Sequence, residues 1–146
     1  MEQTVESEQE AEPLADLETD VDVGGRGARR RSRTLLGLFF IAAGVNHFRD
    51  PRPYERIVPP SLQSEAGRVV MLSGVAEILG GVGVFVPRTR RLSGLWLIGL
   101  LLAVFPANLY MASQPERFDK IPRWALYGRL PLQPLAMLWA WRATRR

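Results

Sequence analysis

Four apolar segments follow one another between residues 34 and 141, and they limit the possible folds more than any other feature of the sequence. They span residues 34–48, 69–86, 92–112 and 124–141. A helix that crosses a bilayer needs about 20 apolar residues, so the last three are long enough, and the first needs its flanks or local thinning of the bilayer. Each segment alone could be a buried helix of a soluble protein, but together they leave almost no polar face to meet water. We therefore predict an all-α polytopic membrane protein built as a four-transmembrane-helix bundle.

The first 33 residues differ from the rest of the chain in charge. Residues 1–25 carry nine acids and no Lys or Arg, whereas the remainder carries all 19 Lys and Arg and six acids. Residues 1–33 include few large apolar groups and no aromatic residue, so they cannot bury enough surface to order themselves. Five arginines at 26–33 are typical of the cytoplasmic flank of a membrane helix, the alternative being a solvated linker. We predict a disordered, acidic and then Arg-rich cytoplasmic tail over 1–33 and a transmembrane domain over 34–146.

The charges of the loops predict the orientation of the bundle. With the N-terminus inside, the inner loops and ends hold eleven Arg, whereas the outer loops hold seven Arg and Lys. Positive residues prefer the cytoplasmic side of a membrane, and Trp and Tyr gather at its two interfaces. The Trp and Tyr residues of this chain lie at segment ends, as with Tyr110, Trp124 and Trp141. We therefore predict a multi-pass protein of the cytoplasmic (inner) membrane with both termini in the cytoplasm.

Rare and absent residue types exclude several kinds of chemistry. The chain has no cysteine, which excludes disulfides, zinc–thiolate sites, iron–sulfur ligation and dithiol relays within it. Its single histidine, His47, cannot form a bis-histidine haem site. One His with one Glu is a poor metal site, so we predict no metal and no built-in cofactor. The basic residues gather at the ends of the apolar segments, which favours a lipid bilayer as partner over nucleic acid.

A proline-rich loop separates the first two apolar segments. Residues 49–67, RDPRPYERIVPPSLQSEAG, contain four prolines, so the loop is too broken for a long helix. Two interpretations remain open for it. The loop either packs as a cap over the bundle or is a mobile surface loop.

Six polar side chains interrupt the apolar segments and are the candidate functional residues. They are Asn46, His47, Glu77, Asn108, Arg129 and Gln133. With a rise of about 1.5 Å per residue, all of them fall between the midplane and the outer surface. Small residues share their helix faces, and small residues mark the contact faces of membrane helices. We therefore predict that these side chains point into the bundle and form one polar cluster in its outer half.

Within this cluster, Glu77 and Arg129 are the expected ion pair, with the other polar side chains as hydrogen-bonding neighbours. Ionisable residues inside a membrane are functional hypotheses by default, so the pair would belong to a ligand or proton site. The same pair can instead fix the register of two helices, and amide side chains can join helices. The residues alone leave both interpretations open.

Four motifs in order resemble the DoxX-like family of small four-helix membrane proteins. They read GVNHFRDPRPYERIVPP, SGVAEILGG, FPANLYMA and RLPLQP, and the resemblance covers residues 34–142. It implies a four-helix bundle in the cytoplasmic membrane of a bacterium or archaeon. The family takes its name from a subunit associated with thiosulfate:quinone oxidoreductase, and members are linked to membrane redox modules. Five of the candidate residues match positions in these motifs, and the resemblance attaches no catalytic role to them. They are His47, Glu77, Asn108, Arg129 and Gln133.

Three functions follow from the polar cluster. The first is an accessory or quinone-interacting subunit of a membrane redox system, in which Glu77 accepts or relays protons and its neighbours donate hydrogen bonds to the quinone oxygens. Because the chain has no electron carrier of its own, this function implies a membrane or soluble oxidoreductase as partner. The second is a binding or transport protein for a small solute or lipid. The third is a structural or assembly protein without catalysis. A stand-alone enzyme is not expected, because no nucleophile–base arrangement or cofactor fingerprint is visible.

Overall fold

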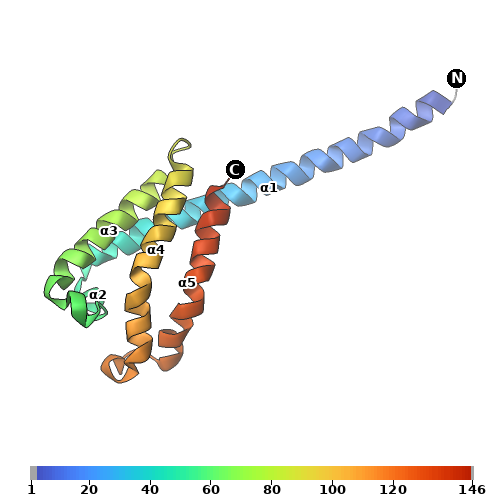
Figure 1. The fold of residues 1–146 in the computed structure, drawn as a ribbon. Helices are drawn as coiled ribbons and strands as arrows, with labels where there is room; N and C mark the ends of the chain where they lie inside the picture. Colours follow the sequence, from blue (N-terminus) through green and yellow to red (C-terminus); the bar gives the residue numbers. More distant parts are fainter. Residues whose placement is uncertain (1–2, 146) are drawn as a thin grey trace. The chain divides into compact units, whose positions relative to one another are not determined.

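The protein is helical throughout the part that the structure, a computed structural model, describes, which is residues 3–145 with side chains from residue 25 onward (Figure 1). The elements are α1 (Gln3–Arg49), α2 (Arg52–Arg56), the 3₁₀ helix η1 (Pro60–Glu65), α3 (Ala66–Gly83), α4 (Arg90–Ser113), the 3₁₀ helix η2 (Pro115–Phe118) and α5 (Arg123–Thr144). The predicted all-α class is therefore confirmed for these residues.

The chain divides by its contacts into two units, Met1–Ser32 and Arg33–Arg146. In the first unit, the backbone of α1 is helical from Gln3 onward. An isolated helix is marginal in water unless it packs on something else. The disorder predicted for residues 1–33 in solution, and the side of the membrane on which they lie, stay predictions.

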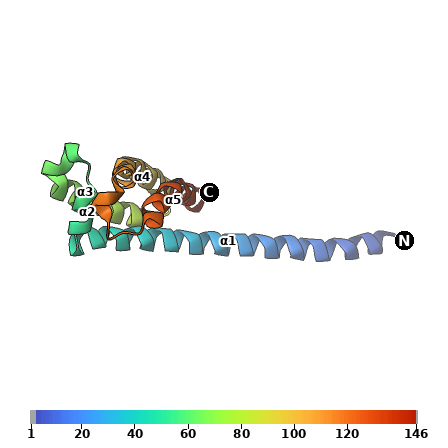
Figure 2. The same ribbon diagram turned by 90° about the horizontal axis from the view of Figure 1, so that it is seen from below.

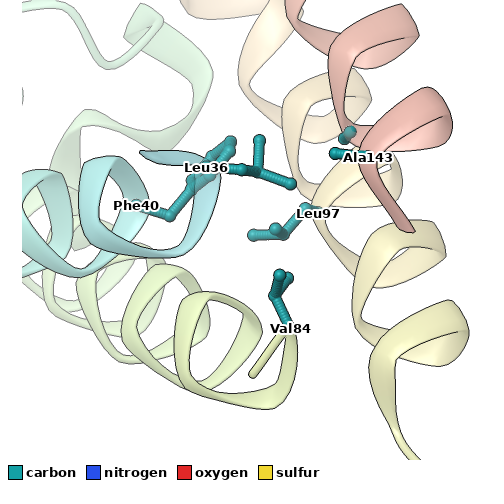
Figure 3. Packing of buried hydrophobic residues seen from close by; sticks show 6 residues of the cluster. Leu36, Phe40, Val84, Leu97 and Ala143 are labelled. Atoms are coloured by element: carbon teal, nitrogen blue, oxygen red, sulfur yellow. The ribbon is translucent and has the colours of Figure 1, made fainter. Parts of the chain in front are cut away.

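The second unit is a bundle of four helical segments. Figure 2 shows residues 33–49 of α1 lying across one side of α3, α4 and α5. One apolar cluster draws on all four segments, with Leu36 and Phe40 from α1, Leu97 from α4, Ala143 from α5, and Val84 at the end of α3 (Figure 3). Each of these side chains is at most 3% exposed. The cluster is the hydrophobic core that holds the four segments together.

Two pairs of glycines bring α1 and α3 into close contact. Gly37 meets Gly81 and Gly44 meets Gly74, so residue numbers rise along one helix as they fall along the other, and the helices run antiparallel. A Cβ atom added at Gly44 would lie 2.6 Å from the carbonyl oxygen of Gly74, and one added at Gly81 would lie 2.8 Å from that of Gly37. Backbones that approach this closely leave no room for a side chain, which is how small residues join helices in membranes.

The prolines of the loop between α1 and α3 break it into two short helices, α2 and η1, as the sequence predicts. We call residues 50–65 the cap. Val58 of the cap is buried against Ala66 and Val70 of α3, with Tyr54 beside them. At the same end of the bundle, Ile57 packs against a second apolar cluster contributed by α4, η2 and α5. The cap is therefore packed on the bundle, which confirms the first of the two interpretations of this loop.

The outer surface of the bundle is strongly apolar. Large side chains such as Leu72 and Leu92 are each 69% exposed, and similar exposed residues cover all four helical segments. Contiguous apolar patches of this kind are rare on soluble monomers. The segment Pro60–Gly83 and the helix Arg90–Ser113 are long and apolar enough to cross a membrane. Two of the four predicted spans thus meet the requirements of length and composition, and four crossings stay a prediction.

Replacing Gly44 by alanine tests the contact between α1 and α3. We expect Gly44→Ala to lower the free energy of unfolding by about 1–3 kcal/mol, because the added methyl group forces the two backbones apart. Chemical denaturation in detergent micelles measures this change. Gly99→Ala is the matched control, because an added Cβ there meets nothing within 4 Å, and it should change stability by at most about 1 kcal/mol, in the stabilising direction. Equal effects of the two substitutions would contradict the assigned contact.

Candidate functional site

A cavity of about 260 Å³ lies beneath the cap. Its lining comes from the end of α1, from the cap, and from α3, α4 and α5. Most of the lining is apolar, including Val58, Leu62 and Val70, and its polar side chains are His47, Tyr54, Ser73, Glu77, Asn108 and Arg129. We call this space the polar cavity. Four of the six residues predicted from the sequence therefore line one cavity, and these are His47, Glu77, Asn108 and Arg129.

Glu77 and His47 lie side by side in this cavity. Both residues are buried, and Oε2 of Glu77 lies 3.4 Å from Nδ1 of His47. Nδ1 also lies 2.9 Å from the carbonyl oxygen of Ala43. Because a carbonyl oxygen only accepts, Nδ1 carries a hydrogen and donates it to Ala43. The other ring nitrogen, Nε2, is then the one that remains for a further partner.

The carboxylate of Glu77 is only partly satisfied. The hydroxyl of Ser73 donates to Oε1 over 3.5 Å, whereas Oε2 is buried and accepts no hydrogen bond among the described residues. A buried acceptor without a donor is destabilising by about 1–3 kcal/mol, and by more when it is charged. Native proteins rarely keep such a group unless it has a function or an unseen partner. Oε2 of Glu77 is therefore the buried atom of this site that lacks a hydrogen-bond donor among the described residues.

Tyr54 connects the cap to α1 above the Glu77–His47 pair. Its ring stacks on the ring of His47, with centroids 3.8 Å apart and planes at 28°. The side-chain nitrogen of Asn46 donates to the Tyr54 hydroxyl over 2.8 Å. Asn46 itself does not line the cavity, and its role is to hold Tyr54. Tyr54 is not among the six residues predicted from the sequence. It is the one aromatic residue of the proline-rich loop, and this could have indicated a contact with the bundle.

Gln133 and Asn108 join α4 to α5. The side-chain nitrogen of Asn108 donates to Oε1 of Gln133 over 2.8 Å. Gln133 is buried, and its own nitrogen donates to the carbonyl oxygen of Leu101. One turn further along α4 stands Pro106, which has no N–H to donate to the carbonyl oxygen of Leu102. Gln133 therefore fixes Asn108 and the proline-containing turn of α4 rather than lining the cavity.

The expected ion pair between Glu77 and Arg129 is not formed, and that prediction is wrong. The partner of Glu77 is His47, because the glycine contacts press α1 against α3. Arg129 belongs to α5, which is fastened to α4 instead. Arg129 lines the same cavity and is exposed, and its guanidinium makes no hydrogen bond or ion pair among the described residues. One cavity thus presents a buried carboxylate oxygen and a free guanidinium from different helices.

The chemistry of the polar cavity is hydrogen bonding and charge. Among the side chains that the structure describes, those of residues 25–145, no three His, Cys, Asp or Glu gather as metal ligands would. The groups available to a bound molecule are the acceptor Oε2 of Glu77, Nε2 of His47, the amide of Asn108 and the guanidinium of Arg129. These groups can hold a small molecule that carries both a donor and an acceptor oxygen.

The hydrogen bond between Asn108 and Gln133 can be measured by a double-mutant cycle. We expect Gln133→Leu to lower the free energy of unfolding by about 1–2 kcal/mol, because it leaves Asn108 and a carbonyl of α4 without their partner. Asn108→Leu should be destabilising too, and the double variant should be less destabilised than the sum of the two. Unfolding in mixed micelles gives the coupling energy. Strict additivity would mean that the two amides do not interact.

Comparison with known proteins identifies the family of this chain and leaves its activity open. Residues 36–144 match DUF8561, which is described as a domain of unknown function. No curated protein and no solved structure matches the chain. The resemblance to DoxX-like proteins accordingly stays a prediction. The match spans the bundle from the start of its core in α1 to the last residue of α5. The chain therefore belongs to the DUF8561 family, whose function is unknown.

Proposed function

We propose that the protein is an integral protein of the cytoplasmic membrane whose four helical segments all cross the bilayer. The support is the inverted distribution of its side chains. Large apolar residues cover the outside of α1, α3, α4 and α5, whereas His47, Glu77 and Gln133 are buried. A protein in water places these two classes the other way round. In a bilayer the exposed apolar side chains face lipid, and the polar ones face the bundle.

The proposed topology places both termini and the turn between α3 and α4 in the cytoplasm, with the cap on the opposite side. The support is the bias of Arg and Lys between the two ends of the bundle, eleven against seven, because positive residues are retained on the cytoplasmic side. The cap end is also where the polar cavity lies.

The absence of cysteine from the chain makes this topology easy to test. We expect Ser64→Cys, in the cap, to react with a membrane-impermeant maleimide on intact cells. Pro87→Cys, in the turn between α3 and α4, should react only after the membrane is permeabilised. Both residues are exposed in the structure. Labelling of both positions on intact cells, or of Pro87→Cys alone, would overturn the proposed orientation.

We infer that the polar cavity binds the headgroup of a small lipid-soluble molecule of the quinone type, as an accessory component of a membrane redox system. The observation that carries this inference is Oε2 of Glu77, which is buried without a donor in a cavity that also presents Arg129. Ligand sites are mostly apolar with a few placed polar groups, and they measure roughly 300–1,000 Å³. At about 260 Å³, this cavity suits one small headgroup.

Oε2 of Glu77, which accepts no hydrogen bond, and the guanidinium of Arg129 suit the two oxidation states of a quinone. The carbonyl oxygens of the oxidised form accept hydrogen bonds from Arg129 and Asn108, whereas a hydroxyl of the reduced form donates to Glu77. Reduction takes up two electrons and two protons. The chain has no cysteine, and the described side chains offer no set of metal ligands for the electrons. A partner oxidoreductase therefore supplies them, and Glu77 relays protons. The resemblance to DoxX-like proteins supports the redox part of this proposal.

The proposal is tested by the molecules that accompany the protein when it is extracted in mild detergent from its own membranes. We expect a quinone to be found by solvent extraction and mass spectrometry of the wild-type protein. In Glu77→Gln and in Arg129→Gln, the quinone per protein should fall about tenfold, the equivalent of about 1.4 kcal/mol of binding. The cause is the loss of one charged hydrogen-bonding group from the cavity in each variant.

The replacement of one acid and of one base outside the cavity serves as the control. Glu116→Gln and Arg123→Gln alter exposed residues that do not line the cavity, and they should keep the wild-type amount of quinone. Thermal midpoints of all variants separate loss of ligand from loss of fold. If Glu77→Gln and Arg129→Gln instead lose a different amphiphile or solute, the protein binds or transports that molecule and is not a quinone-interacting subunit. Equal content in every variant would favour a purely structural role for the polar cluster.

A further inference from the structure

A second cavity lies at the other end of α4, far along the helix from the polar cavity. It measures about 300 Å³ and is lined by Arg91, Leu95, Trp141, Thr144 and Arg145. Arg91 and Leu95 lie in the first two turns of α4, and the other residues lie at the end of α5. We call this space the arginine cavity. None of its residues belongs to the polar cluster, and the proposed function makes no use of them.

The arginine cavity has an excess of positive charge that the bundle does not neutralise. Between Glu77 and Glu116 the chain contains no acid, and it contains none after Asp119. The side chains of Arg91 and Arg145 are exposed, and neither guanidinium group makes a hydrogen bond or an ion pair among the described residues. Two guanidinium groups beside one cavity repel each other and attract an anion, and guanidinium groups match the geometry of phosphate oxygens.

The rest of the lining is mainly apolar, and this favours a lipid over a free anion as the ligand. Leu95 is 54% exposed and Trp141 is 48% exposed. The hydroxyl of Thr144 donates to the carbonyl oxygen of Ala140 over 2.7 Å, so it is already satisfied. Inorganic phosphate would use only the arginines and leave the indole and leucine side chains unused. A phospholipid uses both, with its phosphate on the arginines and its acyl chains along the apolar wall. Basic pockets between membrane helices on the cytoplasmic side bind anionic lipids in this way.

We propose that the arginine cavity is a binding site for an anionic phospholipid of the cytoplasmic leaflet. Arg91 and Arg145 hold the phosphate, and Leu95 and Trp141 flank the acyl chains. This site shares only the membrane placement with the proposed function, because its residues and its ligand differ from those of the polar cavity. A protein that fails to bind quinone can still bind the lipid, and the reverse also holds.

The test measures which lipid the full-length protein retains. The protein is reconstituted in mixed micelles that contain equal amounts of phosphatidylglycerol and phosphatidylcholine with the same acyl chains, and the lipid kept after gel filtration is measured by mass spectrometry. We expect wild type to enrich phosphatidylglycerol at least fivefold. Arg91→Gln combined with Arg145→Gln should bring the ratio close to one.

A matched control also removes two positive charges, but at positions outside the cavity. Arg88→Gln, in the turn before α4, combined with Arg142→Gln, in the last turn of α5, replaces exposed arginines that do not line the cavity. This control should keep at least half of the wild-type enrichment. If both double variants lose it equally, binding depends on net charge alone, and the proposed site is wrong. No enrichment by wild type would also overturn the proposal.

A second measurement distinguishes a lipid from free phosphate. Short-chain phosphatidylglycerol should raise the thermal midpoint of the wild-type protein by several degrees, and inorganic phosphate at the same concentration and ionic strength should not. The Arg91→Gln, Arg145→Gln variant should lose this shift while keeping its own midpoint near that of the control. Equal shifts from the two additives would show a phosphate site without a lipid wall and overturn the proposal.

Discussion

The close contact between α1 and α3 is the constraint on which the rest of the bundle depends. At Gly44 and Gly74 the two backbones touch, and no side chain larger than hydrogen fits between them. His47 lies one turn beyond Gly44, and Glu77 lies one turn beyond Gly74. In antiparallel helices these two positions lie on opposite sides of the glycine contact, with His47 beside Gly74 and Glu77 beside Gly44. Because the backbones are this close, the two side chains still reach each other, and Nδ1 of His47 lies 3.4 Å from Oε2 of Glu77. The partner of the buried carboxylate is thus decided by backbone packing rather than by charge.

The other helices complete a cavity around that pair. The hydrogen bond from the side-chain amide of Asn108 to that of Gln133 fastens α5 to α4, and the stacking of Tyr54 on His47 closes the cap over α1. These contacts satisfy their own polar groups. Oε2 of Glu77 and the guanidinium of Arg129 remain as the unsatisfied groups that face the polar cavity. A bundle that only locked its helices together would have paired them, and this difference is the physical basis of the proposed ligand site.

Much of the site could be predicted from the sequence because helical geometry is local. A fixed rise per residue places Asn46, His47, Glu77 and Asn108 at similar depth, and the structure brings them to the same end of the bundle. The pairing could not be predicted in this way. A helix pattern shows which face a residue occupies but not which helix lies opposite, so Arg129 was expected where His47 stands. Tyr54 was missed because a proline-rich loop has no periodicity to follow.

The amino-acid sequence by itself determined the helical class, the apolar exterior, and the absence of thiols and of a bis-histidine haem site, because each depends on composition and on local periodicity. Only the tertiary structure decided that α1 packs on α3, that the cap closes one end, and that the two arginines of the second cavity come together. These features join residues that are far apart in the chain. Their contact depends on the order in which whole helices pack, which is set by the close fit of glycines and small side chains rather than by any single segment.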